Sequence, residues 1–147
     1  MKKIIVAVFA ITLLFGAFTA QAADVKKRFS VQEAMSLEKV KNALENDIAF
    51  YWGKSAHPPV SKTFGVYKTS KRTNGFRKDH FDACSWAMAS ALVTLRDRAR
   101  REGGNAVINI VSNIKDYEES SESEFSCLVG GLMVNVALKG TVVKLGQ

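Results

Sequence analysis

The chain has 147 residues, a length that suits one domain with a single hydrophobic core. Its 21 Lys and Arg against 14 Asp and Glu give a formal net charge of +7, so an anionic partner fits the composition better than a cationic one. The 2 cysteines leave room for one disulfide and exclude a disulfide-rich scaffold.

The first 22 residues predict a secretory signal peptide. Met1-Lys2-Lys3 is a basic head, residues 4–18 are apolar, and Thr19-Ala20-Gln21-Ala22 contains an Ala-x-Ala cleavage motif. The alternative is a membrane anchor, but the apolar run is shorter than the roughly 20 residues that span a bilayer. We therefore expect cleavage after Ala22, a periplasmic location and no transmembrane anchor. The mature chain, residues 23–147, is expected to form one domain with the charge lowered from +7 to +5 by loss of Lys2 and Lys3.

The segment before residue 79 predicts short helices followed by strands. Residues 24–29 are charged and are expected to form a frayed leader. Ser30-Val31-Gln32-Glu33 fits a capping box, and apolar residues recur at helical spacing as far as Leu44, which predicts one or two short helices. Strands are predicted at residues 47–53 and 62–69, and Asn74-Gly75 predicts a turn.

A long helix is predicted from His80 to Glu102. Asp79 is its expected N-cap, and Gly103 is expected to end it in the left-handed conformation. Buried positions at helical spacing begin at Cys84 and continue to Ala99. Its last turns contain Arg96, Arg98, Arg100 and Arg101, which fit either an anion-binding cluster or cations stabilised by the helix dipole.

The remaining residues predict strands around an acidic loop. A strand is expected at 105–111 and a long apolar strand at 125–138, with Gly130-Gly131 as a bulge or bend. Lys139-Gly140 predicts a turn, and residues 141–145 a short final strand. The expected fold is α+β: a four- to five-stranded, largely antiparallel sheet with the long helix across one face and short N-terminal helices.

The two cysteines predict a disulfide between helix and sheet. Cys84 lies on the buried stripe of the helix and Cys127 in an apolar strand, and export favours oxidation. The alternative is a reactive thiol in a redox protein or sensor, but there is no Cys-x-x-Cys motif.

Charge is unevenly distributed along the chain. Seven basic and no acidic residues lie between Asp47 and Asp79, whereas residues 116–124 hold five acids and no base. The basic stretch fits a solvated strand face, or a contact with anionic lipid headgroups, lipopolysaccharide or an acidic partner. The candidate contact residues are Lys68, Lys71, Arg72, Arg77 and Lys78.

No residue pattern indicates catalysis. The sequence has no Gly-x-Ser-x-Gly elbow and no Gly-x-x-x-x-Gly-Lys-Ser/Thr loop. A metal site would have to use His57, His80, Cys84 or Cys127. Only His80 and Cys84 have the close spacing typical of metal ligands, and the disulfide competes with a metal for Cys84. We expect no enzyme, no cofactor and no metal, with a metal-binding module as an open alternative.

One segment resembles a known group of small domains. An alanine-rich helix over residues 87–99 leads into Gly103-Gly104-Asn105-Ala106-Val107-Ile108-Asn109-Ile110. This order resembles the YbjQ/RcsF-like group, in which a helix leads into a Gly-Ala-Asn-Ala-Val-Val strand; here Gly104 replaces the usual Ala. Over most of residues 48–145 the chain is also similar to small exported bacterial proteins often labelled "excinuclease ATPase subunit", although it has no P-loop. The resemblance implies an envelope protein with a stress-related role and transfers no catalytic residues.

Export, the missing catalytic motifs and the separated charges together predict a non-enzymatic, envelope-associated binding protein. Its expected partner is an envelope protein or an anionic surface. Nucleic acid is not expected, because an exported protein rarely meets it. A redox protein using Cys84 and Cys127 and a metal-binding module are the alternatives. The sequence leaves the oligomeric state open.

Overall fold

A computed structural model describes residues 23–146, so the predicted signal peptide lies outside the described residues. Ten elements follow one another along the chain: β1 (Val25–Ser30), α1 (Val31–Ser36), α2 (Glu38–Leu44), β2 (Ala49–Trp52), β3 (Val60–Asn74), α3 (His80–Glu102), β4 (Ala106–Ile114), β5 (Tyr117–Glu119), β6 (Glu124–Val129) and β7 (Met133–Leu145).

All seven strands belong to one sheet that is organised around β7. The order is β1-β6-β7-β4-β2, with β3 also paired to β7 and β5 to β4. Strand β7 pairs with β3 along its whole length, whereas its other edge pairs first with β6 and then with β4. The pair β2–β4 is parallel and the other pairs are antiparallel, so the sheet is mixed.

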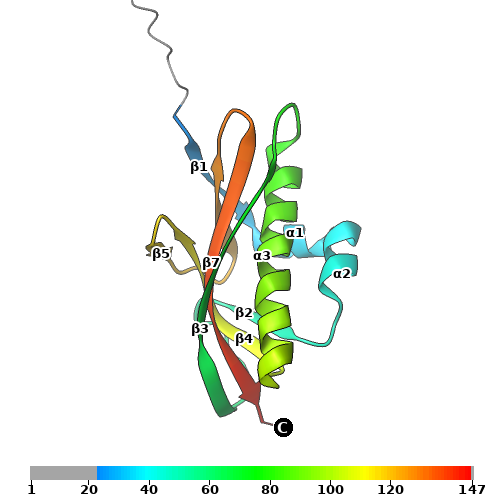
Figure 1. Cartoon of the computed structure of the whole chain (residues 1–147), viewed down its shortest axis with the longest axis vertical. Coiled ribbons are helices and arrows are strands. Elements are labelled where there is room, and N and C mark those ends of the chain that lie inside the picture. Colours follow the sequence, from blue (N-terminus) through cyan, green and yellow to red (C-terminus); the bar gives the residue numbers. More distant parts are fainter. Residues whose placement is uncertain (1–22, 147) are drawn as a thin grey trace, which may run out of the picture.

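The three helices lie on one side of the sheet (Figure 1). Helix α3 packs along β3 and β7, and α1 and α2 pack against α3. Val134, Val136, Leu138 and Val142 of β7 belong to the core beneath α3. Val143 instead joins a small second cluster on the opposite face, as the alternation of side chains along a strand requires.

The predicted four- to five-stranded, largely antiparallel sheet with one long helix is wrong. The sheet has seven strands, curls and is mixed, and three helices accompany it. The charged residues 24–29, expected to be a frayed leader, contain the edge strand β1, which pairs with β6. Charged side chains are common on edge strands, because they discourage pairing with another chain. The polar loop after β4 also contains β5, a strand too short for a periodic signal.

Two predictions based on glycines are wrong: the turn lies at Gly130-Gly131, and Gly140 lies within a strand. Gly130-Gly131 is a hairpin turn between β6 and β7, in which the Gly130 N–H donates to the Met133 carbonyl at 2.9 Å. Gly140, expected in a turn, lies inside β7. A Cβ at Gly140 would lie 2.6 Å from Cγ1 of Val107, so the glycine permits close packing in the core beneath α3.

The ends of the long helix are confirmed. The Asp79 carboxylate accepts a hydrogen bond from the Asp82 N–H at 3.0 Å, and Gly103 adopts a left-handed φ of 80°. The Ser30 cap is also confirmed, because its hydroxyl accepts from the Glu33 N–H at 3.2 Å. The predictions from local capping residues are therefore confirmed, whereas the predicted sheet is wrong.

Candidate functional site

Cys84 and Cys127 form the predicted disulfide. It joins α3 to β6 with a Cα–Cα distance of 6.0 Å, within the range usual for a disulfide. Both residues are 0% exposed. The bridge therefore fastens the long helix to the sheet from within the core, where a protein substrate has no access to the sulfur atoms.

The arginines at the end of α3 serve the fold. Arg96 is buried, and its guanidinium donates to the carbonyls of Ala43 at 2.6 Å and Leu44 at 3.2 Å, at the end of α2. Arg100 donates to Asp47 at 2.6 and 2.7 Å, and this hydrogen bonding lowers the pKa of Asp47.

Arg98 and Arg101 complete this group. Arg98 forms an ion pair with Glu102 at 3.0 Å and lies over the Tyr67 ring at 4.2 Å. Only Arg101 lacks a described ion pair, and it is exposed. An anion-binding cluster at this end of α3 is therefore not supported.

Lys68, the first of the five candidate contact residues, is held by an acid. Its ammonium group donates to the Asp116 carboxylate at 2.7 Å. That hydrogen bond raises the pKa of Lys68 and lowers the pKa of Asp116. The basic stretch and the acidic loop, far apart in the sequence, thus meet on the sheet face opposite the helices. Lys68 has less capacity for a second anionic partner than an unpaired lysine.

The other four candidates, Lys71, Arg72, Arg77 and Lys78, form no salt bridge within residues 23–146. Arg72 lies opposite Asn135 in the register, and Lys71 lies opposite Val136. Because neighbouring side chains alternate, Arg72 faces away from the helices and Lys71 towards them. Arg77 and Lys78 belong to the loop that leads into α3. The four cations therefore surround the last residues of β3 and do not lie on one strand face.

The loop after β3 lies beside the turn between β6 and β7. The Gly75 N–H donates to the Leu132 carbonyl at 2.9 Å, and Asn74 is paired with Met133. A Cβ at Gly75 would lie 2.8 Å from Cγ1 of Val134, so this close approach depends on glycine. We call the surface formed by residues 71–79 and 130–133 the tip, because these segments reach the same end of the long axis (Figure 1).

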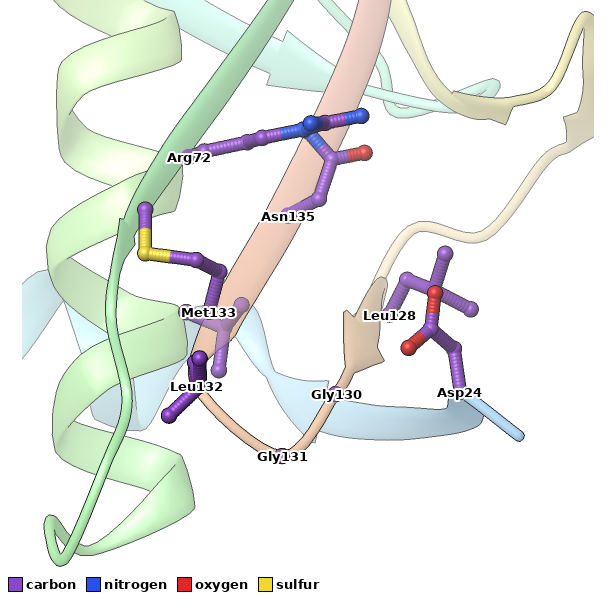
Figure 2. A pocket seen from close by; sticks show the side chains of 9 residues that line it. Asp24, Arg72, Leu128, Gly130, Gly131, Leu132, Met133 and Asn135 are labelled. Carbon is purple, nitrogen blue, oxygen red and sulfur yellow. The ribbon is translucent and has the colours of Figure 1, made fainter. Parts of the chain in front are cut away.

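A hollow of about 410 Å³ lies beside the tip on the face away from the helices. Figure 2 shows Arg72 and Asn135 extending to the same side, with Leu128 and Asp24 across from them. Gly130 and Gly131 form its lower rim, and Leu132 and Met133 follow at the start of β7. The hollow combines one cation, one carboxylate, an amide and apolar side chains, so Asp24 offsets the charge of Arg72 there.

Sequence reasoning identified the cations but missed the apolar residues of the tip. Phe76 is 50% exposed, Leu132 65% and Met133 45%. The sequence predicts Leu132 and Met133 within a long apolar strand with a bulge or bend at Gly130-Gly131, whereas the structure has a hairpin turn there. The signal available in the sequence was the position of each apolar residue within three residues of a glycine turn.

Neither histidine is part of a ligand cluster. His80 Nδ1 lies 2.8 Å from Nζ of Lys27, and His57 Nδ1 lies 2.8 Å from the Pro58 carbonyl. Cys84, the possible neighbour of His80 in a metal site, is used by the disulfide. Among residues 23–146, no group of three or more His, Cys, Asp and Glu side chains is placed to hold a metal ion.

Comparison of the chain with protein-family models, with curated proteins and with solved structures found no match. Within the described part of the chain, no helix has the length and apolar character needed to cross a membrane.

Proposed function

We propose that this chain is an exported, non-enzymatic, envelope-associated protein that binds an anionic partner through the cations of the tip. The observation that carries the proposal is the difference between two groups of basic residues. Arg96, Arg98 and Arg100 are engaged by acids and carbonyls of the fold, whereas Lys71, Arg72, Arg77 and Lys78 have no described acidic partner.

Charge placement supports this proposal, because an ion pair within the fold already satisfies both of its members. Lys26 and Arg28 pair with Glu119, Lys139 pairs with Glu118, and Lys68 pairs with Asp116. Much of the acidic loop is thus neutralised on the open sheet face. The tip keeps a positive field that attracts anions at a distance.

The Cys84–Cys127 disulfide is consistent with an exported protein, since such bonds persist in oxidising compartments. A stress-related role, implied by the YbjQ/RcsF-like resemblance, belongs to the same proposal. The sensing mechanism would need a partner that the tip can contact.

The test is charge reversal with a matched control. Lys71→Glu/Arg72→Glu removes two tip cations, while Lys115→Glu/Lys144→Glu makes the same charge change at exposed residues away from the tip. We expect only the first variant to lose crosslinking to envelope components in intact periplasm, by several fold. Equal crosslinking by the wild type and the Lys71/Arg72 variant would contradict the proposal.

A further inference from the structure

The tip presents apolar side chains at the end of the molecule. Leu132 is 65% exposed, Phe76 50% and Met133 45%. A single exposed apolar residue is ordinary, but here three large ones lie on the loop after β3 and on the adjoining β6–β7 hairpin, and such a grouping points to an interaction site. The hydrogen bond from Gly75 to Leu132 holds the two loops together, so the patch does not depend on one flexible segment.

Cations adjoin these apolar side chains. The guanidinium of Arg77 is 5.1 Å from the centre of the Phe76 ring, and Lys78 follows it in the same loop. Arg72 is opposite Asn135, two residues after Met133, and Lys71 is one position further along the register. Apolar side chains next to cations are also the combination by which amphipathic helices bind the interface of an anionic membrane.

We infer that the tip docks on an anionic phospholipid bilayer. Phe76, Leu132 and Met133 enter the boundary between headgroups and acyl chains, and the four cations contact lipid phosphates. This inference rests on the proposed function and names its partner. It adds the apolar residues, which binding to a soluble anion or to an acidic protein surface does not require.

The shape of the molecule favours a bilayer over a folded protein partner. The tip is one end of an elongated domain (Figure 1), whereas a stable protein interface typically buries about 800 Å² on each partner. Convex loops with apolar ends suit a deformable lipid surface better than a preformed protein surface.

The chain also enters the domain at this end. Strand β1 begins with Val25, which is 55% exposed, and a Cβ at Gly130 would lie 2.6 Å from Oδ1 of Asp24.

The acids near the tip do not cancel its charge. Asp79 uses its carboxylate to cap α3, and Asp82 pairs with Lys39 at 3.5 Å. Asp24 lines the hollow across from Arg72. Arg72 thus shares a hollow with Asp24, and Lys78 lines a second hollow with Asp79 and Asp82. Each cation near an anionic bilayer strengthens binding about fivefold, and added salt weakens this contribution.

The experiment uses the purified exported protein and vesicles of phosphatidylcholine with or without 30 mol% phosphatidylglycerol. We expect sedimentation with the anionic vesicles only. Arg77→Glu/Lys78→Glu should weaken this binding by more than about 25-fold, two cations at about fivefold each. Leu132→Ser/Met133→Ser should weaken it by about tenfold or more, because the apolar contribution is lost.

Two controls separate the tip from the general surface. Tyr117→Ser removes an apolar side chain that is 78% exposed on β5, and Lys144→Glu reverses an exposed charge on β7. Both should bind like the wild type. Circular dichroism and an intact disulfide establish that each tip variant is folded.

Insertion is measured directly by a tryptophan in the tip. Leu132→Trp is placed in a Trp86→Phe background, because Trp86 is 41% exposed whereas Trp52 is buried. We expect a blue shift and quenching by brominated acyl chains on anionic vesicles. An unshifted spectrum, or vesicle binding insensitive to Leu132→Ser/Met133→Ser, overturns the inference.

The outcomes distinguish the inference from the proposed function. Absence of vesicle binding, together with crosslinking to an envelope protein that depends on Lys71 and Arg72, refutes the lipid partner and leaves the proposed function standing. Loss of both the vesicle binding and the dependence of crosslinking on charge refutes both.

Discussion

Removing the disulfide should strongly destabilise the protein. The change is Cys84→Ala/Cys127→Ala, at two residues that are 0% exposed. The bridge joins positions separated by 43 residues, and the chain-entropy relation for a loop of that length gives about 4 kcal/mol. Typical domains have a free energy of unfolding of about 5–15 kcal/mol, so the double variant should lose a large share of it.

The assay is urea unfolding of the purified protein at neutral pH, followed by circular dichroism. We expect the free energy of unfolding to fall by about 4 kcal/mol, and the melting temperature in a thermal scan to fall by roughly 15 °C. The denaturant slope should rise, because an unfolded chain without the crosslink exposes more surface. Ser85→Ala is the matched control, since Ser85 is also 0% exposed and its hydroxyl has no hydrogen-bond partner among the described residues.

A loss below about 1 kcal/mol, or a loss equal to that of Ser85→Ala, would refute the reasoning that the bridge restricts the unfolded chain. The wild-type protein, which keeps both cysteines, tests the thiol-dependent alternative. Both cysteines should resist alkylation in the native state until a reductant is added. Alkylation of either cysteine without reductant would show a free thiol and support the alternative of a redox protein.

Three further predictions concern the links between elements. Asp79→Ala should cost about 1 kcal/mol in thermal unfolding, because the Asp82 N–H loses its acceptor, whereas Asp79→Asn should largely keep the cap; equal losses would contradict the capping role. Arg96→Met should cost about 2–3 kcal/mol, because it leaves the Ala43 and Leu44 carbonyls without a donor, and an unchanged urea midpoint would argue against this. The hydrogen bond from Lys26 lowers the pKa of Glu119 below its usual 4.5, so its contribution is present above about pH 4.5 and is lost as the pH falls through the lowered value. The difference in urea midpoint between the wild type and Glu119→Gln should therefore shrink below pH 4.5, and a difference that stays constant down to pH 3 would refute the assignment.

Local chemistry made part of the fold predictable. Asp79 and Gly103 mark the ends of α3 because capping depends on residues within one helical turn of each end. The helical spacing of Cys84 with Met88 and Leu95 identified the buried face, and all three are at most 1% exposed. Cys84 on that face and Cys127 in an apolar segment were enough to predict the disulfide.

The sheet could not be predicted in the same way, because strand pairing depends on residues distant in the sequence. Strand β1 is charged and forms a strand only by pairing with β6, about 100 residues later. Gly140 has the sequence context of a turn, but in the fold it lies in a strand and packs closely against Val107. The candidate site shows the same division. The sequence by itself determined the local helix caps, the cysteine pair and the list of basic residues. Only the tertiary structure decided that Asp116 neutralises Lys68, and that Gly75 brings Phe76 beside Leu132 at the tip. Ion pairing and surface exposure are properties of neighbours in space, and the fold alone chooses those neighbours.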